Sequence, residues 1–265
     1  MLEVTSLAKS YQSRNGTTDA IADVSFRVAS GEFVCVVGPS GCGKTTLLKC
    51  LAGLLSPTAG EVQLNGEPVR RPPPNMAFVF QDYSNSMLPW LRVENNITFP
   101  LRHKGVSADR RAALAEETLR VVGLGEFARH YPWQLSGGMQ QRVAIARALA
   151  YEPEILLMDE PFASVDAQTR SDLEDLLLDV WARYGVTTVF VTHDIDESVY
   201  LADRVFVLND RPSTVQMEVP VELPRPRDQI TTKELTEFTK LRTEVMRTIK
   251  HARRSRSDEE RMGQA

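Results

Sequence analysis

The stretch FVCVVGPSGCGKTTLLKCLAGLL, residues 33–55, constrains the fold of this 265-residue chain more than any other. The apolar run FVCVVG has the length of a buried strand, and KTTLLKCLAGLL predicts a helix that stops near Ser56 and Pro57. Between them, Gly38 to Thr45 fits the pattern G-x-x-x-x-G-K-[ST], whose glycines allow a tight turn that aims backbone N–H groups at phosphate oxygens. The strand before and the helix after favour a phosphate-binding loop over a glycine-rich turn with an exposed lysine.

Each residue type in this loop has an expected role. Lys44 reaches the β- and γ-phosphates of a nucleotide, the Thr45 hydroxyl helps to hold Mg²⁺, and Thr46 adds a phosphate hydrogen bond. The backbone of the loop supplies the remaining donors. The predicted nucleotide-binding residues of this loop are Gly38, Pro39, Ser40, Gly41, Cys42, Gly43, Lys44, Thr45 and Thr46.

Later apolar runs predict further strands of one sheet. EILLMDE and TTVFVTH are separated by the helical segment QTRSDLEDLLLDVWARYG, and apolar strands that alternate with helices indicate a parallel sheet buried on both faces. From about residue 93 to 150 the pattern is helical, which predicts a helical subdomain inserted into an α/β body.

Polar residues stand where these strands end. In open parallel sheets, ligands bind beyond the carboxyl ends of the strands. Asp159 and Glu160 follow ILLM, so we expect Asp159 to hold Mg²⁺ through water and Glu160 to orient and deprotonate the attacking water. Gln81 ends MAFVF and is placed to sense Mg²⁺ or that water, and His193 ends TTVFVT and is placed to donate to the γ-phosphate. Taken alone, each of these residues is more often structural or solvated; the phosphate-binding loop in the same chain favours the functional interpretation.

A second glycine-bearing helix start lies about a hundred residues after the first, in LSGGMQQRVAIARALA. Ser136 can cap this helix, and Gly137 and Gly138 let a ligand approach bare backbone N–H groups. The chain therefore carries two candidate anion cradles.

Composition excludes several classes of protein. The net charge of −4 offers no broad basic surface, so no nucleic-acid partner is expected. No apolar run approaches the roughly 18 residues of a membrane span, and the first residues lack the layout of a signal peptide. Cys35, Cys42 and Cys50 lack zinc-ligand spacing and indicate free thiols in a reducing compartment. We expect a cytoplasmic chain.

The C-terminal part predicts one more helix. Leu235, Phe238, Leu241, Val245 and Ile249 form one helical stripe, so residues 231–250 are expected to be an amphipathic helix that packs on the body. Residues 251–265 carry mixed charge with little to bury and are expected to be a disordered tail.

Together these motifs resemble the ATP-binding subunit of an ATP-binding cassette (ABC) transporter. They span roughly residues 2 to 226 in the family's order, and LSGG-x-x-QR is peculiar to this family among P-loop proteins. The resemblance implies a P-loop NTPase cassette over residues 1–230: an α/β fold with a mostly parallel sheet, an N-terminal antiparallel β subdomain and the inserted helical subdomain at about 93–150.

The resemblance also implies why there are two cradles. In this family two cassettes pack head-to-tail, and the Ser-Gly-Gly helix of one faces ATP held by the P-loop of the other. Tyr11 is then the aromatic that stacks on adenine, although a half-buried tyrosine at a strand end fits the spacing nearly as well. Asp166, in the loop ASVD where Ala-Leu is usual for Ser-Val, lies across the dimer axis. The partner's nucleotide is contacted by Ser136, Gly137, Gly138 and Gln140.

The resemblance further implies a membrane partner. The segment DYSNSMLPWLRVENN after Gln81 is apolar for a loop, and it either docks a transmembrane permease or packs under the helical subdomain. The elements VFQDYSNSMLPW, DEPFASVDAQTR and LPRPRD look most like the nitrate/sulfonate/taurine importer group, in which permease and solute-binding protein are separate chains. Such a subunit sits on the inner face of the membrane. An exporter subunit and a soluble cassette ATPase of repair or translation remain alternatives.

Overall fold

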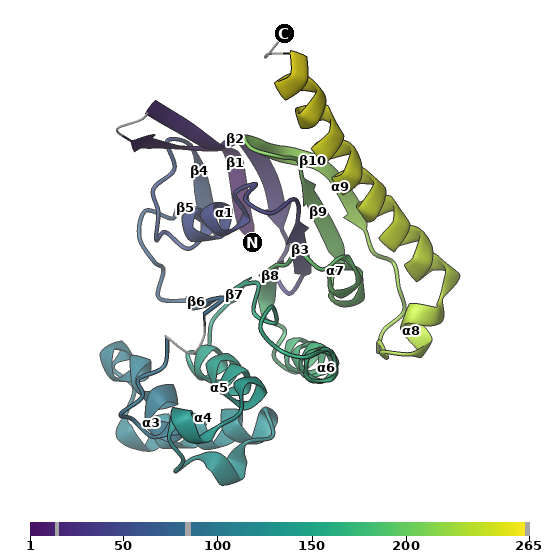
Figure 1. Ribbon diagram of the computed structural model, residues 1–265. Coiled ribbons are helices and arrows are strands. Elements are labelled where there is room, and N and C mark those ends of the chain that lie inside the picture. Colours follow the sequence, from purple (N-terminus) through teal and green to yellow (C-terminus); the bar gives the residue numbers. More distant parts are fainter. Residues whose placement is uncertain (14–15, 83–85, 263–265) are drawn as a thin grey trace. The chain divides into compact units, whose positions relative to one another are not determined.

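The computed structural model describes residues 1–13, 16–82 and 86–262, with side chains described as far as His251. The chain divides into two compact units. The first combines Met1–Pro73 with Thr187–Ala265, and the second is Pro74–Val186. Figure 1 shows the elements of both units.

The first unit is built on strands in the spatial order β5-β4-β1-β2-β10-β9-β3-β8. The N-terminal strand β1 pairs antiparallel with β2 and with β4, while β3 runs parallel to both β8 and β9. All five residues of β3 and of β8 are buried, as expected for central parallel strands. The bounds are β1 Leu2–Ser13, β2 Gly16–Val28, β3 Phe33–Val37, β4 Ala59–Leu64, β5 Glu67–Pro68, β8 Thr187–Val191, β9 Arg204–Leu208 and β10 Ser213–Pro220.

Helices of the first unit follow two of these strands and end the chain. Helix α1 (Lys44–Leu51) follows β3, and α7 (Ile195–Leu201) follows β8. Helices α8 (Thr231–Glu234) and α9 (Thr236–Met262) come last, and α9 packs on α7, β9 and β10 (Figure 1).

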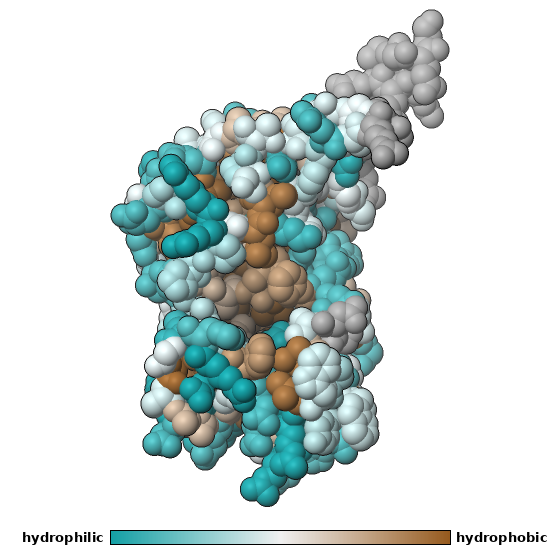
Figure 2. All heavy atoms as spheres, turned by 90° about the vertical axis from the view of Figure 1, so that its left-hand side faces the viewer, coloured by the Kyte–Doolittle hydropathy of each residue, from teal (hydrophilic) through white to brown (hydrophobic). Residues whose placement is uncertain are grey.

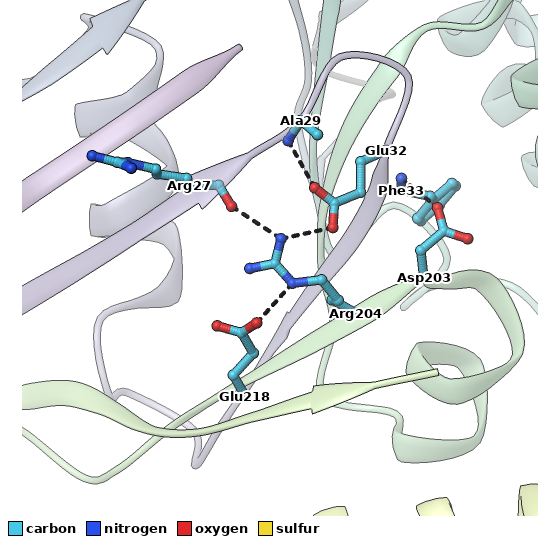
Figure 3. Close-up of polar contacts among 7 residues, drawn as sticks. All are labelled: Arg27, Ala29, Glu32, Phe33, Asp203, Arg204 and Glu218. Carbon is cyan, nitrogen blue, oxygen red and sulfur yellow. Dashed lines mark hydrogen bonds and ion pairs between the residues drawn. The ribbon is translucent and has the colours of Figure 1, made fainter. Parts of the chain in front are cut away.

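A network of polar contacts fixes the start of β9 between its neighbours (Figure 3). The Arg204 guanidinium donates from Nη1 to Glu32 Oε1 at 2.8 Å and from Nε to Glu218 Oε1 at 2.9 Å. The other Glu32 carboxylate oxygen accepts from the Ala29 backbone at 2.7 Å, and the Phe33 backbone donates to Asp203 at 2.9 Å. Because Glu32 precedes β3 and Glu218 lies on β10, these contacts set the register of β9 against both strands.

The terminal helix differs in two ways from the sequence prediction. Phe238, Leu241 and Val245 are buried, but Leu235 is 37% exposed because the break between α8 and α9 falls there. In addition, α9 continues to residue 262, into the segment expected to be a disordered tail. Arginine and glutamate are good helix formers, so a charged segment can continue a helix. Residues 263–265 of that tail lie outside the described residues.

The second unit contains a pair of parallel strands and a set of helices. Strands β6 (Met76–Val79) and β7 (Ile155–Asp159) pair in parallel, and α3, α4 and α5 pack on one another. The helical elements are α3 Val93–Thr98, η1 Pro100–Lys104, α4 Ala108–Val121, η2 Gly125–Phe127, η3 Pro132–Gln134, α5 Gly137–Ala150 and α6 Ala167–Tyr184.

The polarity of the surface and the state of the cysteines complete the description of the fold. Hydrophilic residues cover much of the face in Figure 2, with smaller hydrophobic patches between them. In the described part of the chain, no helix is long and apolar enough to cross a membrane. All three cysteines are free and buried.

Candidate functional site

The predicted P-loop connects β3 to α1 and leaves the helix start without a side-chain cap. Gly43 is the N-cap residue with φ +110°, in the region that glycine tolerates best. Lys44 is 5% exposed, and its Nζ donates to the carbonyls of Gly38 at 3.0 Å and Pro39 at 3.1 Å. The ammonium is thus held over the loop itself, within reach of an anion that binds the first backbone N–H groups of α1.

The loop's glycines are required by close backbone approaches. A Cβ on Gly38 would lie 2.9 Å from the carbonyl oxygen of Leu208, and one on Gly43 would lie 3.0 Å from the carbonyl oxygen of Ala20. Both neighbours are backbone atoms of strands and cannot move aside cheaply. Cys42 is buried in the loop, and burial raises the pKa of its thiol, so the sulfur stays protonated in the predicted phosphate-binding loop.

Tyr11 lies beside the P-loop helix. Its hydroxyl is 3.2 Å from the Thr46 hydroxyl, and 42% of Tyr11 is exposed. Lys9 lies 5.5 Å from the centre of the Tyr11 ring. The structure therefore brings the predicted adenine-stacking residue into contact with one of the predicted phosphate-binding residues.

His193 and the P-loop emerge from neighbouring strands. Val36 of β3 pairs with Val191 of β8 in parallel, and Gly38 and His193 each follow two residues later. His193 is exposed, and Asp194 caps α7 by accepting from the Glu197 backbone at 3.1 Å. The cap fixes the helix directly after His193, which keeps this side chain at the edge where the P-loop begins.

Gln81 and Glu160 are brought together by the second parallel pair. Val79 of β6 pairs with Met158 of β7, so Gln81 and Glu160 each stand two residues beyond the pair. Gln81 Nε2 lies 3.4 Å from Glu160 Oε2. Glu160 has φ +43°, a left-handed conformation that costs on the order of 1–3 kcal/mol for a non-glycine residue and is typical of functional sites.

The residues predicted to hold Mg²⁺ suit that ion by chemistry. Asp159 is the last residue of β7 and is 3% exposed, and Thr45 is half-buried in the first turn of α1. Protein sites for Mg²⁺ use one or two oxygen ligands and leave the rest to water and substrate phosphates. No group of three or more His, Cys, Asp or Glu side chains arranged for a metal occurs in the described part of the chain.

The second cradle is capped by its own serine. Ser136 is the N-cap of α5, and its Oγ accepts from the Met139 backbone at 3.3 Å. Ser136 and Gly137 are exposed. Gln140 turns inward: its Nε2 donates to the carbonyls of Pro132 at 3.0 Å and Leu135 at 3.2 Å, so this amide holds the chain that leads into the helix.

Thr169 links the second cradle to Asp166, a contact that the sequence did not reveal. A Cβ on Gly138 would lie 2.5 Å from Thr169 Cγ2, so the start of α5 packs closely against this side chain. Thr169 donates to Asp166 twice, from its backbone at 3.0 Å and from its hydroxyl at 2.7 Å. These hydrogen bonds hold the pKa of Asp166 below its ordinary value, so the carboxylate stays ionised.

In the segment after Gln81, some apolar side chains are buried and others are exposed. Met87 is 3% exposed, as the packing interpretation requires, but Trp90 is 70% exposed. Residues 83–85 lie outside the described residues. In the same unit, a cavity of about 430 Å³ opens between α3 and α4 and is lined by Glu94, Asn95, Thr98, Arg102, Ala108, Arg111, Ala112, Ala115, Glu116, Leu119, Gly125 and Ala128.

Comparison with known proteins gives consistent matches. A family model described as "ABC transporter" matches residues 21–163. An uncharacterised ABC transporter ATP-binding protein of Methanocaldococcus jannaschii is 46% identical over 254 residues, which cover 94% of each chain. The nitrate import ATP-binding protein NrtD of Synechocystis sp. is 44% identical over 223 residues, covering 84% of this chain and 83% of the relative. The aliphatic sulfonates import ATP-binding protein SsuB of Bacillus anthracis is 39% identical over 250 residues, covering 94% and 96%.

Solved structures share the fold. A dimeric post-hydrolysis state of the ATP-binding cassette MJ0796, bound to ADP and Pi, matches with a TM-score of 0.74 and 34% identity over 83% of this chain and 99% of that chain. The structure of cbiO1 from Clostridium perfringens, part of the ABC transporter complex cbiONQ, matches with a TM-score of 0.73 and 28% identity over 83% and 88%.

Proposed function

The chain belongs to the ABC transporter family as an ATP-binding, ATP-hydrolysing subunit, and from this premise we propose that it energises an importer for a small solute of the nitrate, sulfonate or taurine type. The expected fold class, an α/β ABC cassette, is confirmed by the same matches. The nitrate and sulfonate import relatives support the solute class, since the chain matches them over most of both lengths.

The observation that carries the proposed mechanism is the pair formed by Gln81 and Glu160 beyond two parallel strands. Glu160 acts as the base that orients and deprotonates the water, and Gln81 positions that water beside it. The P-loop N–H groups and Lys44 hold the phosphates, and His193 donates to the γ-phosphate. Catalysis is mainly positioning and charge neutralisation. Thr45 and Asp159 would be ligands for Mg²⁺, which would supply positive charge.

The working unit is a head-to-tail dimer of two copies. The start of α5 completes the nucleotide site of the other copy with Ser136, Gly137 and Gly138. The dimeric form of the matched cassette structure supports this arrangement. ATP binding closes the dimer, hydrolysis opens it, and Asp166 couples the two sites through its contact with Thr169.

The helical part of the second unit docks a transmembrane permease, which places the subunit on the inner face of the membrane. The cavity between α3 and α4 offers a hollow for a permease segment, and the exposed Trp90 adds an aromatic of the kind that dominates interfaces. A separate solute-binding protein then acts on the permease from the other side.

The test is a native pull-down. The chain is tagged at its N-terminus, the source membranes are solubilised gently, and bound proteins are identified by mass spectrometry. We expect a multi-span permease together with a solute-binding protein. Recovery of a permease without any solute-binding protein favours an exporter, and recovery of only ribosomal or repair proteins contradicts a transport role.

Two tryptophans give the experiment a matched pair of variants. Trp90 and Trp133 are both 70% exposed in the same unit. Trp90→Ala is expected to lower permease recovery about thirtyfold, which corresponds to the roughly 2 kcal/mol of a hot-spot residue, and Trp133→Ala is expected to leave it unchanged. Equal recovery with both variants would place the docking surface elsewhere.

A further inference from the structure

The hairpin formed by β9 and β10 follows the P-loop along its length. The parallel pairing of Val37 with Val207 brings Gly38 beside Leu208, the last residue of β9. On the other side of the hairpin turn, Ser213 lies close to Gly43, where an added Cβ would be 3.5 Å from the serine Oγ. The two ends of the P-loop are therefore both placed against this one hairpin.

Between these two points the hairpin turn contributes one charged contact. Arg211 donates to the carbonyl oxygen of Gly41 from Nη2 at 2.9 Å and from Nε at 3.2 Å. Gly41 has φ +78°, a left-handed conformation that favours glycine, so the guanidinium contacts the loop at a turn. Hydrogen bonds to a charged donor are about twice as strong as neutral ones.

The contact fixes a peptide unit from both sides. The carbonyl of Gly41 and the N–H of Cys42 belong to the same planar peptide group. The carbonyl accepts from Arg211, and the N–H donates to the carbonyl of Pro39 at 3.3 Å. With both ends held, this peptide cannot rotate, and the N–H groups that follow it in the loop keep their direction.

We propose that Arg211 is a positioning residue for nucleotide binding, which sets the shape of the P-loop from the β9–β10 turn. This inference rests on the proposed nucleotide site at the P-loop. Arg211 acts through Gly41 rather than through the reacting atoms. The network around Arg204 holds the opposite end of β9, so the hairpin is a firm support for this contact (Figure 3).

The experiment compares nucleotide binding in variants of the full chain. Equilibrium dissociation constants for fluorescent ATP and ADP analogues are measured for Arg211→Ala, Arg211→Lys and Arg211→Gln, and the KM for ATP and kcat are measured beside them. Arg27→Ala is the matched control, because Arg27 is an exposed arginine of the same unit whose guanidinium pairs with Glu3 at 2.6 Å.

We expect Arg211→Ala to raise Kd and KM about tenfold, because it removes both hydrogen bonds from this exposed guanidinium to the Gly41 carbonyl. We expect kcat at saturating ATP to stay within about twofold, because ground state and transition state use the same loop shape. Arg211→Lys, which keeps charge and one donor, is expected to recover part of the affinity. Arg211→Gln, which loses the charge, is expected to recover less.

Three outcomes would overturn the inference: an Arg211→Ala variant whose Kd stays within twofold of the wild type, a loss of kcat at unchanged KM, or an equal loss in the Arg27→Ala control. If Arg211→Ala does not fold, the same measurements and the same limits are applied to Arg211→Gln. Lys44→Ala tests the nucleotide site separately from the role of Arg211. If Lys44→Ala binds nucleotide normally, the proposed site is wrong. If Lys44→Ala loses binding but Arg211→Ala does not, only the positioning role of Arg211 is rejected.

Discussion

The chain contains two glycine-bearing helix starts, and they differ in how their N-termini are capped and supported. The start of α1 has a glycine N-cap and no side-chain cap, and its loop is held from outside by Leu208 and Arg211. The start of α5 is capped from within by Ser136 and rests on Thr169. At the start of α1 no side chain caps the backbone N–H groups. At the start of α5 the Ser136 side chain already accepts a hydrogen bond from one of them.

This difference suggests a division of labour between the two helix starts. A helix N-terminus without a side-chain cap offers backbone N–H groups to an anion. A helix start whose backbone already donates a hydrogen bond to Ser136 adds only modest affinity and suits a contact that forms and breaks in each cycle. In our account the first cradle holds ATP, and the second senses the ATP of the other copy.

The first expected effect concerns the binding of ATP at the first cradle. Lys44→Ala removes the ammonium that the loop carbonyls of Gly38 and Pro39 now hold, and we expect ATP affinity to fall on the order of 100-fold. Titration with a fluorescent ATP analogue measures this loss. An affinity within twofold of the wild type would show that α1 does not begin at the nucleotide.

The second effect separates binding from hydrolysis. Glu160→Gln keeps the shape of the side chain beside Gln81 but removes the base, so we expect kcat to fall by roughly 10² to 10⁴ while ATP affinity stays within twofold. ATPase assays and nucleotide titration on the same sample give both numbers. A variant that hydrolyses ATP at half the wild-type rate would remove Glu160 from the mechanism.

The third effect tests the contact between Gly138, at the start of α5, and the Thr169 side chain. Gly138→Ala brings a Cβ to 2.5 Å from Thr169 Cγ2, and we expect a loss of about 1–3 kcal/mol from overpacking. Thr169→Ser removes that methyl group but keeps the hydroxyl that donates to Asp166, so the double variant is expected to recover most of the loss. Urea unfolding measures both changes, and additive losses in the double variant would contradict the contact.

The smallest effect concerns the cap itself. Ser136→Ala removes the acceptor for the Met139 backbone, and we expect the free energy of unfolding without nucleotide to fall by about 1 kcal/mol. No corresponding cap exists at Gly43, so a substitution there acts through strain instead. Unchanged stability in Ser136→Ala would mean that the second start is as open as the first.

The sequence predicted the parts of this comparison that depend on local pattern. The strand, glycine turn and helix around Lys44 follow from residue order alone, as does the serine before α5. The parallel arrangement of apolar runs also placed Gln81 and Glu160 at strand ends, although their pairing needed the register of β6 and β7.

Residues that act across long sequence separations could not be predicted in this way. Arg211 is 170 residues from Gly41, and nothing in its neighbours marks it as a contact of the P-loop. Thr169 lies in the segment that was predicted to be helical, where nothing set it apart. Leu235 was assigned to the buried stripe because periodicity does not show that α8 ends there. Such contacts depend on how strands and helices pack, which a periodic pattern leaves open.

The central claim is that the two cradles belong to one site shared between two copies. The most direct test mixes two variants, both carrying Glu160→Gln so that ATP is retained: one also has Lys44→Ala, and the other also has Ser136→Arg, which blocks the start of α5. Each protein alone lacks a complete site, but a mixed dimer contains one intact pair. Gel filtration with ATP is predicted to show monomers for each variant alone and a dimer for the mixture. A mixture that stays monomeric while the Glu160→Gln protein alone dimerises would contradict the shared site.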